Sequence, residues 1–266
     1  MVHQAAIDPL YSLSGLAVGL LVGLTGVGGG SLMTPLLVVL FGVHPAVAVG
    51  TDLLYAAATK SVGTAVHGFS GTVDWRLVRR LAAGSVPATA ATVAVLDLLG
   101  GIGSAHGGAA SGLISFVLGL AVLMTAVLLL SRPWLLRAIG PRLGADGPRN
   151  AAALTVLTGA VLGVLVSLSS VGAGALGTTV LFLLYPRMAT ARIVGSDIAH
   201  AVPLTLLAGF GHWMLGSVDW HLLLSLLTGS IPGIVIGSLI AVRVPDGLIR
   251  PALACVLLLV GSRLVF

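Results

Sequence analysis

Charged residues are scarce in this chain. Asp, Glu, Lys and Arg make up 8% of the 266 residues, while 57% are hydrophobic. A soluble domain carries about 25% charged residues, so the charges here are too few to cover a surface that faces water. Aromatic residues are also few, at 5%, which argues against a large hydrophobic drug as a ligand. The one cysteine, Cys255, excludes an intrachain disulfide.

The motifs of several chemistries are missing as well. The sequence has no H-E-x-x-H, C-x-x-C or P-loop pattern, and no Ser/His/Asp cue in a usable context. We therefore expect no catalytic residues, no metal site and no cofactor, and the chain is not expected to be an enzyme. The net charge of +5 does not indicate a nucleic-acid partner, because no basic patch is interleaved with aromatic residues.

Long uncharged stretches are what the sequence does contain. Residues 9–51, 98–131 and 150–186 carry no Asp, Glu, Lys or Arg, and each exceeds the about 20 residues that a helix needs to cross a bilayer. The sequence therefore predicts an all-α integral membrane protein with about eight hydrophobic segments, embedded in the lipid of a cell membrane, with the bacterial inner membrane as the expected location.

The chain also repeats itself. L-T-G-V-G-G-G at 24–30 returns as L-S-S-V-G-A-G at 168–174, and V-G-T-D at 49–52 returns as V-G-S-D at 194–197. An offset of 144 to 145 residues, held through small and polar positions, indicates an internal duplication. We expect three parts, which are a first transmembrane repeat (1–131), an Arg/Pro-rich cytoplasmic linker (132–150) and a second transmembrane repeat (151–266).

Each repeat opens on an apolar segment that glycine interrupts. Residues 10–25 and 31–41 would form helices of about 24 and 16 Å. Either the segment crosses the membrane once with a kink, or its two arms fold back as a re-entrant hairpin. The kinked form gives parallel repeats, whereas the hairpin gives inverted repeats. Positive residues favour the cytoplasmic side. If the link at Arg76, Arg79 and Arg80 and the 132–150 linker are cytoplasmic, the inverted arrangement also brings Arg187, Arg192, Arg243 and Arg250 there and leaves Arg263 outside, whereas the parallel arrangement does the reverse. The sequence therefore favours inverted repeats with hairpins.

The two interruptions are candidate anion sites. A break at membrane depth is tolerated only where it faces protein or a wet cavity, and free amides at a helix N-terminus attract anions. The alternative is close helix packing through small residues. The candidate ligands are the glycines and hydroxyls of the two breaks, namely Thr25, Gly28, Gly29, Gly30, Ser31 and Thr34 in the first and Ser169, Ser170, Gly172, Gly174 and Thr178 in the second.

Charged residues within the apolar stretches are candidates for function, because an ionisable group in a membrane is costly. Asp52 and Asp197 suit a proton or cation role, and helix N-capping is the alternative for both. Lys60 and Arg192 are candidates for binding an anion, with snorkelling to the membrane surface as the alternative. Neither cation has a charged equivalent in the other repeat, which is typical of specialisation.

His67 and His212 occupy matching positions in the two repeats. A histidine titrates near neutral pH, so both are candidates for proton relay. Because both lie near the ends of apolar segments, an interfacial side chain is the favoured interpretation.

The motifs resemble those of a known family. G-L-L-V-G-L-T-G-V-G-G-G-S-L-M-T-P-L-L at 19–37 and V-G-T-D-L at 49–53, with their second copies, are similar to the TauE/SafE sulfite exporter family. The resemblance covers nearly the whole chain and implies export of sulfite or an organosulfonate. The chain departs from the pattern in the second repeat, where Ala173 interrupts the glycine run.

The sequence thus predicts a secondary transporter for a small anion, which is held between the two broken segments and moved by alternating access. The resemblance implies that it is an exporter. The absence of a nucleotide-binding motif points to coupling with a proton or another ion, or to the substrate gradient alone. An anion channel and a transporter of a small carboxylate without sulfur are the alternatives. Association into a homo-oligomer is left open.

Overall fold

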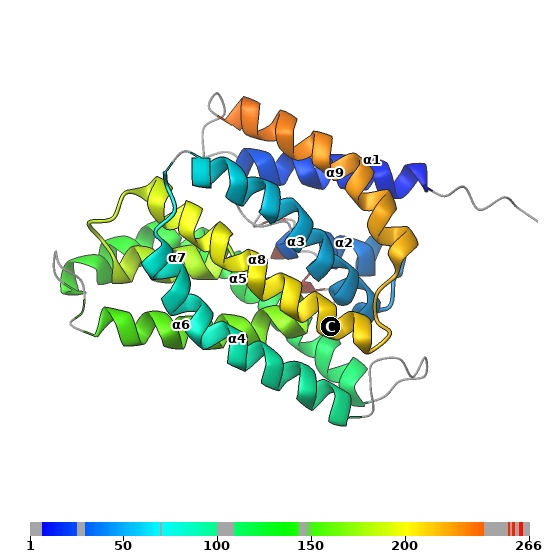
Figure 1. Cartoon of the computed structure of the whole chain (residues 1–266), viewed down its shortest axis with the longest axis horizontal. Helices are drawn as coiled ribbons and strands as arrows, with labels where there is room; N and C mark the ends of the chain where they lie inside the picture. Colours follow the sequence, from blue (N-terminus) through cyan, green and yellow to red (C-terminus); the bar gives the residue numbers. More distant parts are fainter. Residues whose placement is uncertain are drawn as a thin grey trace, which may run out of the picture.

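The structure is a bundle of helices that follows the apolar segments of the sequence (Figure 1). This computed structural model describes residues 7–25, 30–69, 71–99, 109–143, 148 and 150–241, and positions 255, 257, 258, 261 and 262. These residues form helices and no strand. The helices are α1 (Pro9–Thr25), α2 (Gly30–Phe41), α3 (Pro45–Phe69), α4 (Trp75–Leu98), α5 (Ala109–Leu143), α6 (Ala151–Ser169), α7 (Ala175–Leu184), α8 (Thr190–Met214) and α9 (Trp220–Ala241).

Five helical stretches in the described part are long and apolar enough to cross a membrane, and they lie in α4, α5, α6, α8 and α9. Shorter apolar helices are found in α1, α2 and α7, as expected for segments that glycine interrupts. The predicted all-α, multi-pass membrane protein agrees with this architecture. The last of the eight hydrophobic segments, which the sequence places at 247–265, lies mostly outside the described residues.

Helix α5 continues beyond the predicted end of the first repeat. It runs to Leu143, so residues 132–143 of the expected linker are helical. The apolar stretch Phe116–Ala138 accounts for the extension, because it includes Trp134, Leu135 and Leu136. The three-part division of the chain stays a prediction.

Helices of one repeat pack mainly against helices of the other. α1 lies along α9, α4 lies along α6, and the equivalent helices α3 and α8 meet at the centre between these two pairs (Figure 1). Glycines allow the close approach at matching positions, since Gly15 faces Leu226 and the equivalent Gly159 faces Leu81. The tertiary contacts therefore repeat with the same offset as the sequence.

Two hydrogen bonds tie the repeats together in a matching way. The amide of Asp74 donates to Ser196 Oγ at 2.8 Å, and the amide of the equivalent Asp219 donates to Thr51 Oγ1 at 3.0 Å. The hydroxyls of the V-G-T-D and V-G-S-D motifs thus each bind the backbone of the other repeat, just before α9 and α4, respectively. This contact fixes α3 and α8, which carry the candidate charged residues, relative to both halves.

Candidate functional site

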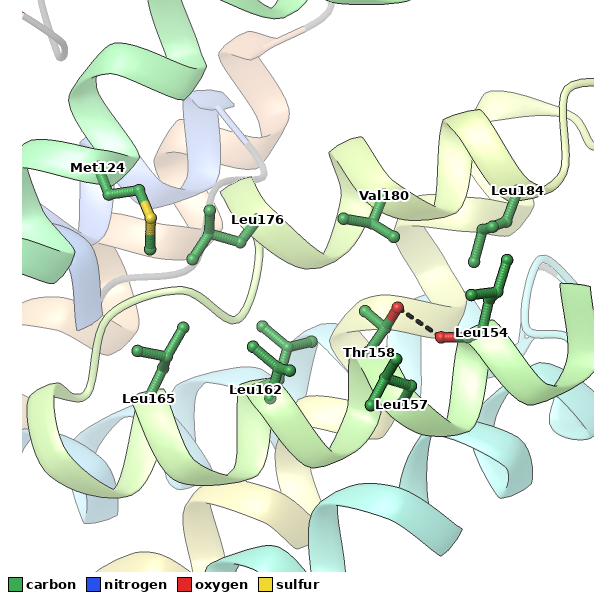
Figure 2. Close-up of a pocket in the computed structure, with 10 residues that line it drawn as sticks. Met124, Leu154, Leu157, Thr158, Leu162, Leu165, Leu176, Val180 and Leu184 are labelled. Atoms are coloured by element: carbon green, nitrogen blue, oxygen red, sulfur yellow. Dashed lines mark hydrogen bonds between the residues drawn. The ribbon is translucent and has the colours of Figure 1, made fainter. Parts of the chain in front are cut away.

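The chain reverses direction at the second glycine break. α6 ends at Ser169 and α7 begins at Ala175, and Figure 2 shows α7 running back beside α6, with Leu176 near Leu165 and Leu184 near Leu154. At the far end of the hairpin, the Tyr185 hydroxyl lies 2.7 Å from Thr155 Oγ1 in the second turn of α6. The start of α6 and the end of α7 therefore lie side by side.

The turn of this hairpin depends on left-handed backbone conformations. Gly172 and Gly174 have φ of 116° and 124°, and Ser170 has φ of 56°. Only glycine adopts the first two without strain, which explains why glycine stands at two of the five candidate positions of the second break. The Ser169 hydroxyl supports the turn by accepting a hydrogen bond from the Val171 amide at 3.2 Å.

Several amides expected to be free are used within the break. Those of Leu176 and Gly177 donate to Gly172 O at 3.2 and 3.4 Å, and that of Thr178 donates to Gly174 O at 3.2 Å. The Thr178 hydroxyl also donates to Gly174 O. The prediction of free amides in the first turn after this break is wrong for these three residues, because the tight turn leaves carbonyls within reach of them.

The groove between the arms of the hairpin is apolar (Figure 2). It encloses about 300 Å³ and offers almost no polar group to an anion. Its lining comes from α5, α6 and α7, namely Met124, Leu154, Leu157, Thr158, Val161, Leu162, Leu165, Leu176, Val180 and Leu184. A site for a small anion is therefore to be sought at the turn of the hairpin rather than between its arms.

Asp52 lies on the central helix α3 and is fully buried. The Thr34 hydroxyl of α2 donates a hydrogen bond to Asp52 Oδ2, and the Ser170 side chain of the second break lies close to the same carboxylate. Asp52 Oδ1 and Ser170 Oγ make no hydrogen bond. Asp52 thus joins an arm of the first broken segment to the turn of the second.

Asp197 holds the equivalent place on α8, where it is 1% exposed. Its Oδ1 makes no hydrogen bond and lies against Gly177 of α7, at a place that a Cβ would occupy. N-capping does not explain either aspartate, because α3 begins at Pro45 and α8 begins at Thr190. The capping interpretation is wrong for both, since each carboxylate lies within its helix and not at the start of it.

Lys60 lies on α3 with only 8% of its surface exposed. Its Nζ donates to Ala173 O in the second break at 3.4 Å, and its charge interacts with Asp197 and, more weakly, with Asp52. Snorkelling to the membrane surface is therefore wrong for Lys60. The structure brings together five of the predicted residues, namely Thr34, Asp52, Lys60, Ser170 and Asp197, and we call them the central cluster.

Other predicted residues lie elsewhere or beyond description. Arg192 has 52% of its side chain exposed and pairs with Asp74 at 3.6 Å, so the structure does not bring it to the central cluster. Gly28 and Gly29 lie outside the described residues, and Gly30 is the first residue of α2. The side chains of Thr25, Ser31 and His67 are likewise outside the described part of the structure, although all three residues are helical.

His212 is buried rather than interfacial. Its Nε2 lies 2.8 Å from Ser167 O, which links α8 to α6. The favoured interpretation of an interfacial side chain is therefore wrong for His212, because its side of α8 faces α6, while the neighbouring Trp213 and Met214 are exposed.

His200 is a site residue that was not predicted from the sequence. This histidine is fully buried on α8, its Nε2 lies 2.8 Å from Ser85 Oγ of α4, and its ring is close enough to Lys60 for an electrostatic interaction. Its equivalent in the first repeat is Tyr55, which lies close to Ser230, the equivalent of Ser85. The two contacts, His200 with Ser85 and Tyr55 with Ser230, are related by the same 145-residue offset. A comparison of the repeats that also considered polar residues of different types at equivalent positions would have indicated both.

Comparisons with known proteins cover nearly the whole chain. The model of a family described as Sulfite exporter TauE/SafE matches residues 11–264. The chain is 40% identical over 254 residues to a probable membrane transporter protein of Bacillus subtilis (strain 168), YjnA, covering 95% of this chain and 98% of that protein. It is 29% identical over 241 residues to a probable membrane transporter protein of Xylella fastidiosa (strain 9a5c), covering 86% and 83%. No solved structure matches the chain. The resemblance found in the motifs is thereby confirmed.

Proposed function

Because the chain belongs to the sulfite exporter TauE/SafE family of membrane transporters, we propose that it is a secondary transporter of a small anion such as sulfite or an organosulfonate. The anion binds in the bacterial inner membrane at the central cluster, between the two broken segments. Export is the direction that the family description suggests. The family is one of transporters and not of enzymes.

Two contacts support an inverted arrangement of the repeats. Arg80 donates to the Tyr185 hydroxyl at 3.3 Å, and Arg192 lies 3.6 Å from Asp74. The link between α3 and α4 and the link between α7 and α8 therefore share one end of the bundle. Parallel repeats would put these two links on opposite sides of the membrane, whereas inverted repeats put them together on the arginine-rich, cytoplasmic side.

The shape of the second broken segment supports a re-entrant hairpin. α7 returns the chain to the start of α6, where Tyr185 meets Thr155, so the hairpin enters and leaves on the same side. With one such hairpin in each repeat, the two turns approach each other from opposite faces, and α3 and α8 pass between them. This is the arrangement in which repeats rock against each other around a fixed central site.

The observation that carries the proposal is the burial of Lys60 beside the second turn. An ionisable residue at this depth is costly and is a functional hypothesis by default. A sulfonate or sulfite has several acceptor oxygens and little apolar surface, so it requires donors. The Lys60 ammonium has three N–H donors, of which one bonds Ala173 O and two are left for an anion, and the Ser170 hydroxyl lies beside them, next to Asp52.

Transport into proteoliposomes tests this assignment. Uptake of labelled sulfite and of an alkanesulfonate is measured with the unmodified protein, with Lys60→Ala, and with Arg79→Ala as the control. Arg79 is exposed at the start of α4, so its removal takes away one positive charge without touching the central cluster. We expect Lys60→Ala to reduce uptake at least tenfold and Arg79→Ala to leave it unchanged.

The same assay distinguishes the alternatives. Uptake that saturates with anion concentration supports a transporter, and a flux that rises linearly indicates a channel. Stronger competition from acetate than from an alkanesulfonate would indicate a carboxylate substrate. Unchanged uptake by Lys60→Ala would remove Lys60 from the site.

A further inference from the structure

The two aspartates of the central cluster are equivalent by sequence but differ in their hydrogen bonds. Asp52 accepts a hydrogen bond from Thr34, whereas the equivalent threonine of the second repeat, Thr178, donates to the backbone carbonyl of Gly174. Hydrogen bonds to a carboxylate stabilise its charged form. The ionised form of Asp52 therefore has a support that the second repeat does not give to Asp197.

The surroundings of Asp197 offer Oδ1 no donor. This oxygen lies against Gly177 and makes no hydrogen bond. Lys60 bonds Ala173 O, four residues before Gly177, and it is the cation that acts on the charge of Asp197. The charge of Asp197 therefore depends on Lys60. A buried charge that loses its partner is strongly destabilising, so Asp197 remains ionised only while Lys60 is available to it.

Among the described residues, few charged or titratable side chains lie near Asp197 on the helices packed against α8. α3 contributes Lys60 and Asp52, and α8 itself contributes His200. α6 and α7 contain no titratable side chain, and α4 has none between residues 81 and 96. The start of α4 carries the exposed Arg76, Arg79 and Arg80, and before them the Asp74 amide donates to Ser196 Oγ while its carboxylate pairs with Arg192. Because Asp74 and Arg192 offset each other at that end, the charge at the centre is set by Lys60 and the two aspartates, with His200 bonded to Ser85.

We infer that a proton and the anion are taken up together, with the anion on Lys60 and the proton on the carboxylate of Asp197. This inference rests on the proposed function. Before the anion binds, the positive charge of Lys60 offsets the negative charge of Asp197. An anion that engages Lys60 adds a second negative charge beside Asp197, and one proton on that carboxylate restores the balance. Asp52 keeps its charge because Thr34 remains bound to it.

The coupling makes anion affinity depend on pH in a defined way. Binding is reciprocal, so if the anion promotes protonation, protons promote anion binding to the same degree. With one proton per anion, the apparent affinity rises by up to about tenfold for each unit by which the pH falls, within the range in which Asp197 gains its proton. The anion and the proton then cross the membrane in the same direction, so export of the anion carries a proton outward against the inward proton gradient and is driven by the gradient of the anion.

The test uses the full-length protein in detergent and an alkanesulfonate, which stays ionised throughout. Sulfite is unsuitable here because it takes up protons itself near neutral pH. Sulfonate binding is measured by calorimetry between pH 5.5 and 8.5, and proton uptake is measured with an indicator dye in weakly buffered solution. We expect about one proton per bound sulfonate in the unmodified protein, and about none in Asp197→Asn, whose affinity becomes independent of pH.

The control is Asp97→Asn, which removes an exposed carboxylate near the end of α4, outside the central cluster, and should behave like the unmodified protein. Asp52→Asn neutralises the equivalent aspartate, and it is expected to keep about one proton for each sulfonate that it still binds. The inference is overturned if the unmodified protein binds sulfonate without proton uptake, if uptake is lost in Asp52→Asn and kept in Asp197→Asn, or if replacing Na⁺ by choline abolishes binding. The first result needs no variant, so it stands even if Asp197→Asn does not fold. Failure of the unmodified protein to bind sulfonate or sulfite at any pH would instead contradict the proposed function.

Discussion

The different hydrogen bonds of Thr34 and Thr178 predict different costs for the same substitution. Valine at either position keeps the branched shape and removes the hydroxyl. A hydrogen bond to a charged group contributes about 1.5–3 kcal/mol, and one between neutral groups contributes about 0.5–1.5 kcal/mol. Thr34 donates to the buried carboxylate of Asp52, so we expect Thr34→Val to lower the free energy of unfolding by about 1.5–3 kcal/mol.

Thr178→Val is expected to cost about 1 kcal/mol or less. The substitution removes the hydrogen bond from the Thr178 hydroxyl to Gly174 O. This oxygen still accepts the hydrogen bond of the residue 178 amide at 3.2 Å. No buried polar group is then left without a hydrogen-bond partner, and it is an unpaired buried group that makes the removal of a hydrogen bond strongly destabilising. The two substitutions are therefore a matched pair, with equal chemistry at equivalent positions of the two repeats.

The measurement is equilibrium unfolding in mixed micelles, titrated with sodium dodecyl sulfate and followed by the fluorescence of the four tryptophans. Thr34→Val is also measured in an Asp52→Asn background, where the loss should shrink by about 1 kcal/mol or more, because the charged acceptor is gone. If Thr178→Val proved as costly as Thr34→Val, or if the Asp52→Asn background left the cost of Thr34→Val unchanged, the contrast between the two aspartates would be refuted.

Three further substitutions test other contacts. Gly177→Ala should fold but lose most anion uptake, because its Cβ would meet Asp197 Oδ1; uptake into proteoliposomes at normal levels would contradict this. Ser196→Ala should lower the free energy of unfolding by about 1–3 kcal/mol, because it leaves the Asp74 amide without its hydroxyl partner, and micelle unfolding measures it. Tyr185→Phe should cost about 1 kcal/mol in the same assay, because it removes the hydroxyl that closes the hairpin.

Much of the architecture could be predicted from the sequence because it depends on local signals. The arms of the broken segments were expected at 10–25 and 31–41, and the structure has them at Pro9–Thr25 and Gly30–Phe41. Uncharged runs and glycine clusters determine these limits without reference to the rest of the fold. The membrane class and the family follow from the same signals.

The roles of single polar residues were harder to predict, because they depend on contacts across the repeats. A cap was a reasonable interpretation of Asp52, since Thr-Asp pairs begin many helices, but the preceding V-A-V-G is already helical in α3. Arg192 was a candidate ligand until the fold brought Asp74 beside it. His200 had no histidine opposite it in the other repeat, so a search for identical residues passed over it.

The exchange of helix partners between the halves has a consequence for each half on its own. α1 has its main partner in α9, and α4 has its main partner in α6, so one repeat alone leaves two apolar helices without the surfaces that cover them. A protein of a single repeat would need a second copy of itself to complete this packing. Two halves separated after the end of α5 at Leu143 and produced together should therefore reassemble.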